Sequence, residues 1–183
     1  MSSTARVGSD EVLRLFLALR LPDDVLDGLE RWSQATLGGG RAVTRGQLHV
    51  TLAFLGGRPA RELQGIVESL REAASRSTAF TLRPLRYRET RSVGMIVLDD
   101  VSGGAGRLAA DLHDRLERLG AYRREARQWL PHVTVLRFRA RPRLSPPVPA
   151  LGEFAPSDAA AFVSRLHPAG ARYEVLESVP LGG

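Results

Sequence analysis

The sequence predicts an α+β fold: a bilobal protein with two pseudo-symmetric lobes of antiparallel sheet and flanking helices around a central cleft. Three observations support this class. The pattern His-x-Thr occurs twice inside apolar runs, at residues 49–51 and 132–134. Strand and helix patterns follow each other without the sustained alternation of a parallel sheet. A chain of 183 residues with 43% hydrophobic residues is long enough for one well-buried core.

The first half of the chain reads as strand, helix, strand, helix. Leucines at every second position from 13 to 19 predict a strand, and Pro22 then opens a helix that ends near Gly38. The first His-x-Thr strand covers Leu48–Phe54 and is predicted to end at the glycines that follow it. After Pro59, apolar residues at helical spacing predict a second helix.

The second half begins with a hairpin, predicted over residues 80–87 and 92–98. A third helix is expected from Gly106 to Leu119, with Gly120 as its C-terminal cap. The second His-x-Thr strand starts after Pro131. Five prolines make 139–156 a loop, and a closing hairpin is predicted over 160–166 and 172–181. Residues 1–10 are expected to be a disordered lead, and 11–183 a single bilobal domain.

Composition limits the kinds of site that the chain can build. A net charge of +6 favours an anionic partner such as nucleic acid, although all 26 basic residues are Arg, which indicates a compositional bias. The absence of Cys excludes disulfides and thiolate chemistry. The apolar segment 12–21 contains two arginines and is too short to span a bilayer, so we expect a cytoplasmic protein without a membrane partner.

The repeated motif is the main candidate for chemistry. Side chains alternate along a strand, so His49 and Thr51 lie on one face, as do His132 and Thr134. Two imidazoles can exchange protons near neutral pH, and two hydroxyls can donate to a phosphate. One histidine would act as the base and the other as the acid, which predicts a bell-shaped pH dependence of turnover. We take His132 as the base and His49 as the acid, although the sequence does not decide between the two orders.

These residues resemble the RNA 2',3'-cyclic phosphodiesterase family, also called 2'-5' RNA ligases, of the two-histidine phosphoesterase superfamily. The resemblance covers roughly residues 15–181. It rests on the strand 15–19 before a Leu-Pro helix start, the segments 48–56 and 131–137 around the two motifs, and the closing Ser164-Arg165-Leu166 with Tyr173-Glu174. It implies catalytic histidines at His49 and His132.

The resemblance also implies an activity. The family opens 2',3'-cyclic phosphates at RNA ends to leave a 2'-phosphate, without metal or cofactor, and can join RNA halves in the reverse direction through a 2'-5' linkage. The substrate would be an RNA end, tRNA fragments among them, and the protein a monomer. Thr51, Thr134 and Arg137 would bind the phosphate. Strict alternation puts Arg137 on the opposite face, which a bulge or strand end would reconcile.

Two other functions stay open from the sequence. One is a hydrolase for a small cyclic nucleotide such as ADP-ribose 1'',2''-cyclic phosphate, which would use the same four residues. The other is a non-catalytic RNA-binding module, for which paired histidines are unnecessary. The basic run 137–143 could track an RNA backbone, and Trp129 or Tyr87 could stack a base in place of the aromatic that many relatives have where this chain has Met95. His113 is predicted to face solvent.

Overall fold

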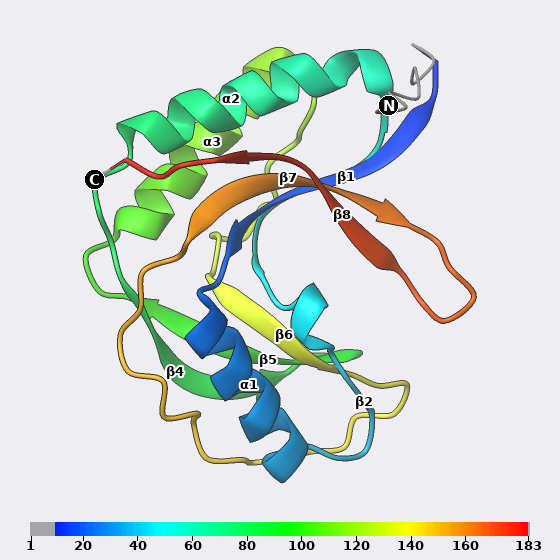
Figure 1. The fold of residues 1–183 in the computed structure, drawn as a ribbon, viewed down its shortest axis with the longest axis vertical. Coiled ribbons are helices and arrows are strands. Elements are labelled where there is room, and N and C mark those ends of the chain that lie inside the picture. The colour runs from blue at the N-terminus through cyan, green and yellow to red at the C-terminus, as the bar shows by residue number, and fades with distance from the viewer. Residues whose placement is uncertain (1–9, 183) are drawn as a thin grey trace, which may run out of the picture.

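The computed structural model describes residues 10–182 and shows one curled antiparallel sheet with three helices (Figure 1). The strands are β1 (Val12–Arg20), β2 (Arg41–Ala42), β3 (Val50–Pro59), β4 (Leu82–Glu89), β5 (Val93–Asp100), β6 (His132–Arg137), β7 (Asp158–Arg165) and β8 (Arg172–Val179). The helices are α1 (Asp23–Thr36), α2 (Leu63–Arg76) and α3 (Gly104–Leu119), with 3-10 turns η1 (Arg45–Gln47) and η2 (Ala60–Glu62). The strand order is β4-β5-β6-β3-β1-β7-β8, and β2 pairs with β6.

The α+β class and each predicted helix and strand are confirmed, within a few residues at their ends. The sequence did not predict the two-residue strand β2 or the two 3-10 turns. β3 is longer than predicted because Gly56, at φ +68°, lies beside a register irregularity opposite β1, and the strand continues through the glycines. The predicted lead falls outside the described residues except for Asp10, and the single domain over 11–183 stays a prediction.

One face of the sheet is covered by helices and forms the main core. Leu15, Leu17 and Leu19 of β1 are almost completely buried on this face, and each such burial stabilises the fold by about 1.5–3 kcal/mol. α2 and α3 lie over the end of the sheet that contains β1 and β7, whereas α1 lies near β4 and β5 (Figure 1). Within residues 10–182, none of the three α-helices covers the opposite face, which we call the site face (Figure 1).

The division into two lobes is not confirmed, because all strands belong to one sheet. β4, β5 and β6 form one set of strands, and β3, β1, β7 and β8 form another. The two sets are hydrogen-bonded to each other only where Val50 pairs with Val133, among the strands that the structure describes. Each set therefore contributes one His-x-Thr motif, and the motifs meet where the sets join.

Candidate active site

The two His-x-Thr motifs lie side by side in antiparallel strands. Val50 and Val133 are the middle residues of the motifs, they are buried in the core, and they pair across β3 and β6. Their neighbours therefore point to the site face. Because the strands are antiparallel, His49 lies on the same side of this pair as Thr134, and Thr51 lies beside His132. The sheet register thus gathers all four predicted side chains around one point.

Both histidine rings are held by the same local hydrogen bond. His49 Nδ1 lies 2.7 Å from the carbonyl oxygen of Gln47, and His132 Nδ1 lies 2.8 Å from that of Leu130, in each case two residues earlier. A carbonyl only accepts, so Nδ1 is the donor and Nε2 is left for other partners. His49 Nε2 lies 3.0 Å from Thr51 Oγ1. The two imidazoles therefore present the same nitrogen at the site.

A bulge follows the Thr in each motif. In β3, Thr51 pairs with Ala18 of β1, and Phe54 pairs with Phe16. Two residues lie between Thr51 and Phe54, but only one lies between their β1 partners, so β3 contains one extra residue here. In β6, Thr134 pairs with Met95 and Leu136 with Gly94, which leaves Val135 as the extra residue. Each bulge moves the residue three positions after the Thr onto the site face, because partners across a ladder share a face.

The bulge in β6 resolves the question about Arg137. This residue pairs with Val93, which shares a face with Met95 and therefore with Thr134. Arg137 is exposed at the end of β6. It lies on the His49 side of the Val50–Val133 pair, and its charge is close enough to lower the pKa of His49. Its predicted place beside the motifs agrees with the observed geometry.

His49 packs against an aromatic cluster on the site face. Its ring centroid lies 5.0 Å from that of Phe16 and 5.6 Å from that of Tyr173, and Phe16 stacks on Phe162 at 4.9 Å. Burial here lowers the pKa of His49 from 6.5 to about 4, with a further decrease from the charges of Arg137 and His132, against an opposing contribution from the Gln47 hydrogen bond. In the free protein at neutral pH, His49 is therefore uncharged.

His113 is buried behind the site, so the prediction that it faces solvent is wrong. Only 4% of the residue is exposed, and its Nε2 donates to the carbonyl oxygen of Leu52, 2.7 Å away. Leu52 is the extra residue of the β3 bulge. Trp129 Nε1 donates to the neighbouring carbonyl of Thr51 at 3.0 Å. These two side chains therefore satisfy backbone acceptors where the β3 ladder is irregular.

A family model described as the 2'-5' RNA ligase superfamily matches residues 21–168. The chain belongs to this superfamily. The match includes both His-x-Thr motifs and thus confirms the resemblance drawn from them. None of the curated proteins matches the chain at a significant level.

Solved structures of this superfamily and of similar folds agree with the assignment. E. coli LigT is 26% identical with a TM-score of 0.81, and the match covers 95% of this chain and 100% of LigT. TT0787 of Thermus thermophilus is 30% identical with a TM-score of 0.81, over 93% of this chain and 99% of that one. The PDE domain of MHV ns2, at 14% identity and a TM-score of 0.52 over 90% and 99%, shares the fold alone. Membership of this superfamily supports a phosphodiesterase enzyme.

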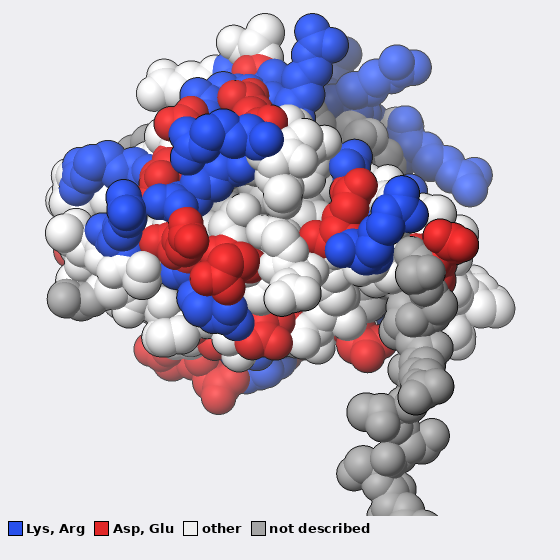
Figure 2. All heavy atoms as spheres, turned by 90° about the horizontal axis from the view of Figure 1, so that it is seen from above, with Lys and Arg blue, Asp and Glu red and all other residues white. Residues whose placement is uncertain are grey.

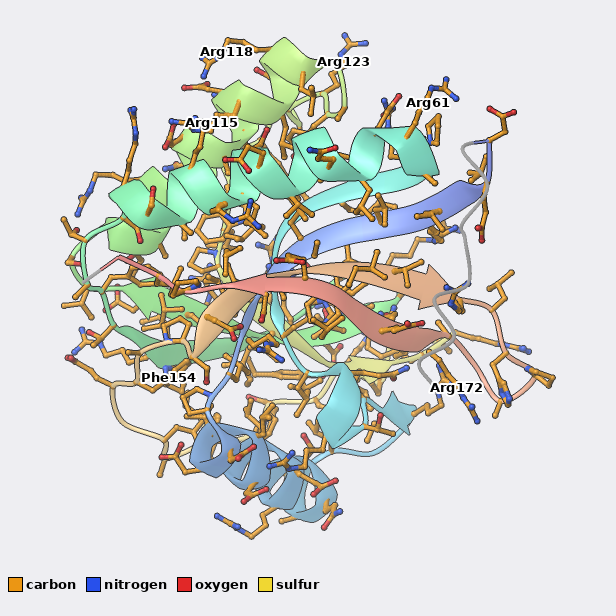
Figure 3. The ribbon with its side chains drawn as sticks, turned by 45° about the horizontal axis from the view of Figure 1, so that its top comes forward. Arg61, Arg115, Arg118, Arg123, Phe154 and Arg172 are labelled. Atoms are coloured by element: carbon orange, nitrogen blue, oxygen red, sulfur yellow. The ribbon has the colours of Figure 1, made fainter. Side chains whose placement is uncertain are left out.

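Basic and acidic side chains are mixed on the helix-covered side of this superfamily member. Figure 2 shows Arg and acidic side chains interspersed over that side, and Arg115, for example, pairs there with Glu72 and with Asp111. Figure 3 shows Arg115 and Arg118 on α3, and Arg123 in the segment just after it, away from the sheet. Such a surface has no single-sign field with which to attract a polyanion. The helix-covered side is therefore a poor candidate for an RNA surface.

Arginines without a carboxylate partner surround the site instead. Arg14, Arg41 and Arg137 form no ion pair with any acidic residue in the described part of the chain. Arg41 of β2 pairs through its backbone with Arg137 and approaches the turn at Gly170, between β7 and β8. Arg172 begins β8 just after this turn (Figure 3). These arginines of the superfamily member are thus available to bind an anion around the two motifs.

Only part of the predicted basic run 137–143 is available to contact an RNA backbone. Glu89, whose side chain is 2% exposed, accepts from Arg141 Nε at 3.1 Å and from the backbone N–H groups of Arg143 and Leu144 at 3.0 and 2.8 Å. Tyr87 Oη donates to the same carboxylate at 3.1 Å. Burial alone would raise the pKa of Glu89, but these hydrogen bonds outweigh it and lower the pKa. The segment after β6 is therefore anchored to β4.

The remaining candidates have structural roles. Trp129 and Tyr87 are partly buried, pack against the core and are hydrogen-bonded through Nε1 and Oη. Asp100 accepts from the N–H groups of Ala105 and Gly106 and thereby caps the start of α3. In residues 10–182, no group of three His or acidic side chains is arranged to hold a metal ion, and no helix is long and apolar enough to cross a membrane.

The lowered pKa of His49 predicts the pH profile of this superfamily member. If neutral His49 is the base, kcat/KM stays high as pH falls from 7 and declines only near pH 4. Replacing Tyr173 by Ala opens one side of the ring to water and should move this acid limb upward, towards 6.5. Steady-state rates between about pH 3.5 and 9 measure the acid limb of the wild-type protein and its shift in the Tyr173→Ala variant. A kcat/KM that falls as pH rises through 4 would instead assign His49 as the acid.

Proposed function

We propose that this superfamily member hydrolyses RNA 2',3'-cyclic phosphate ends to 2'-phosphates without a metal ion. The observation that carries the proposal is the pairing of Val50 with Val133, which brings one imidazole and one hydroxyl from each strand to the same point of the site face. Hydrolysis of a cyclic phosphodiester needs one group to accept a proton and another to donate one. Two histidines on opposite sides of the phosphorus supply both.

The chemical step uses the Nε2 atoms, because Nδ1 of each ring is engaged by a backbone carbonyl. One Nε2 takes a proton from the attacking water as its oxygen bonds to phosphorus, and the other gives a proton to the 3' oxygen as the P–O3' bond breaks. Thr51, Thr134 and Arg137 would donate to the non-bridging oxygens, on which charge builds in the transition state. The product keeps its phosphate on the 2' oxygen. If the 5' hydroxyl of a second RNA attacks in place of water, the same breakage of the P–O3' bond gives a 2'-5' linkage, which is ligation.

The environment of the two rings favours a reversal of the roles assigned from the sequence. His49 lies in an aromatic cluster and near the positive charge of Arg137, and its pKa is lowered to about 4. A neutral imidazole is a base, so His49 is the better candidate to accept the proton of water. His132 would then donate to the leaving oxygen.

The solved relatives support a nucleotide substrate. E. coli LigT has been solved with 3'-AMP, with NADP+ and with ATP, at 25% identity to this chain in each case. All three ligands combine an adenine base with a phosphorylated ribose. We extend this nucleotide binding to RNA ends that carry a cyclic phosphate, including those of tRNA fragments. The proposed enzyme acts as a monomer in the cytoplasm.

Purified protein assayed on short oligoribonucleotides that end in a 2',3'-cyclic phosphate tests the proposal. We expect hydrolysis to a 2'-phosphate, and unchanged turnover in EDTA, because the site supplies its own acid, base and anion ligands. Parallel assays on ADP-ribose 1'',2''-cyclic phosphate test the alternative that the substrate is a small cyclic nucleotide, by comparing its kcat/KM with that of the oligoribonucleotide. Loss of turnover on chelation that a divalent metal restores, or a product with a 3'-phosphate, would contradict the mechanism.

A further inference from the structure

Gln47 binds two partners that lie far apart in the chain. Its backbone carbonyl accepts the hydrogen bond from His49 Nδ1 at 2.7 Å. Its side-chain Nε2 donates to the backbone carbonyl of Ala171, in the turn that joins β7 to β8. The residue is half-buried and is the last of η1. One residue therefore links the β7–β8 hairpin to the imidazole of the first motif.

The turn at residues 166–171 has little other support. The hairpin projects from the sheet at the right of Figure 1, and Leu166 is 91% exposed. Two hydrogen bonds inside the turn, at 2.8 and 3.2 Å, both have His167 as the acceptor. Within residues 10–182, the bond from Gln47 is the only hydrogen bond that joins this turn to an element other than β7 and β8.

The hairpin also contacts the His49 ring directly. Tyr173, near the start of β8, meets the ring edge-on, with the ring centroids 5.6 Å apart and the planes at 79°. Ala171 lies only two residues before Tyr173. The hairpin therefore restrains the imidazole in two ways, by packing against the ring and through the Gln47 carbonyl that accepts its hydrogen bond.

The turn η1 alone holds the Gln47 peptide group loosely. η1 contains three residues, and its closing hydrogen bond, from Leu48 N–H to the Arg45 carbonyl, is long at 3.3 Å. Outside the turn, Arg45 donates from Nε to Asp27 of α1 at 2.7 Å. That contact is made by the first residue of η1, whereas the carbonyl that holds His49 belongs to the last. The side-chain bond to the hairpin is therefore the contact best placed to fix this carbonyl.

We propose that Gln47 is a positioning residue for His49, and that it acts by tying the carbonyl that holds Nδ1 to the β7–β8 hairpin. The tautomer of a neutral histidine is set by the hydrogen bond that one of its nitrogens makes. With the Nδ1 proton donated to Gln47, Nε2 keeps the lone pair that can accept a proton. Displacement of the carbonyl would allow the proton to move to Nε2, where it blocks that lone pair. The consequence for turnover rests on the proposed function, with His49 as the base, whereas the consequence for the tautomer does not.

Nuclear magnetic resonance of isotope-labelled imidazole nitrogens observes the tautomer without turnover. At about pH 8, where ordinary histidines are neutral, we expect His49 to carry its proton on Nδ1 in the wild type and to populate both tautomers in Gln47→Met. Met is similar in length to Gln but has no donor. His132 is the control within the same spectrum, because its acceptor is the carbonyl of Leu130. A His49 tautomer that Gln47→Met leaves unchanged, or a shift of equal size at His132, would overturn the inference.

Kinetics on a cyclic oligoribonucleotide measure the consequence for turnover. Gln47→Met should lower kcat about fivefold, the contribution of one neutral hydrogen bond, with KM nearly unchanged. Arg45→Met is the matched control, since it frees the same turn from α1 instead of from the hairpin. Gly170→Ala acts from the hairpin side: Gly170 has φ +116°, which alanine rarely adopts, so the backbone before Ala171 should shift. The double variant Gln47→Met/Gly170→Ala should lose no more than Gln47→Met alone, because both changes break one link.

The outcomes distinguish this inference from the proposed function. An equal loss of kcat in Arg45→Met would show that only the stability of η1 matters, and would overturn the role of the hairpin. Losses that multiply in the double variant would overturn it too, since the two changes would then act independently. Wild-type protein that hydrolyses no cyclic phosphate, with the change of the His49 tautomer intact, would overturn only the proposed function.

Discussion

Replacement of either His49 or His132 by alanine should lower turnover at least about a hundredfold. Each imidazole is proposed to carry one of the two proton transfers, and loss of general acid or base catalysis costs about 10²–10⁴ in rate. The Nδ1 hydrogen bonds to the backbone carbonyls of Gln47 and Leu130 orient both rings. The effect should therefore appear in kcat more than in KM.

Matched variants separate chemistry from general damage. Thr51→Ala and Thr134→Ala should reduce turnover less, since they remove one hydrogen-bond donor to the phosphate and leave both proton carriers. His167→Ala is the histidine control, because His167 is exposed in the turn between β7 and β8. Rates are measured on the cyclic oligoribonucleotide, with circular dichroism to confirm folding. Equal, small effects of the two motif histidines would favour a binding module over an enzyme.

Glu89→Ala should destabilise the protein by about 3 kcal/mol. The carboxylate is buried and accepts hydrogen bonds from Tyr87, Arg141 and two backbone N–H groups, so its removal leaves several donors without a partner. One of these N–H groups belongs to Arg143, which has φ +58°, an unfavourable backbone conformation outside glycine. The anchor therefore also maintains the turn after β6.

Urea unfolding and limited proteolysis measure this effect. We expect a lower midpoint and new cleavage within residues 139–150, where chain is released when the anchor is lost. Glu153→Ala is the control, since Glu153 lies in the same segment but is half exposed in its ion pair with Arg83. A loss of less than about 1 kcal/mol in Glu89→Ala would show that the hydrogen bonds reform elsewhere or reach water.

The sequence predicted most of the fold because its elements are locally marked. The leucines of β1 alternate, α3 ends at Gly120 with φ +75°, and prolines mark the segment after β6. β2 carried no such signal, because a two-residue strand depends on a partner far away in the chain. The single sheet was missed for the same reason: periodicity identifies strands but not which strands pair.

The site could be predicted as a set of residues but not as an arrangement. A repeated His-x-Thr identifies four side chains, whereas the bulges at Leu52 and Val135 depend on the register with β1 and β5. Those bulges decide that Phe54 and Arg137 share the site face. His113 was misjudged because its neighbours Leu112 and Asp114 gave no sign of the carbonyl that it meets on β3.

Buried His113 couples the unfolding of this protein to the uptake of protons. Burial lowers its pKa below the usual 6.5, mainly by desolvation, and the pKa of His49 is lowered to about 4. The unfolded chain, with ordinary histidines, therefore binds more protons than the native state once the pH is below about 6.5. The stabilisation linked to these two rings is complete above that pH and is lost as the pH falls towards their native values. Protons thus act as a ligand of the unfolded state, and the two rings at and behind the site contribute to how much acid the fold withstands.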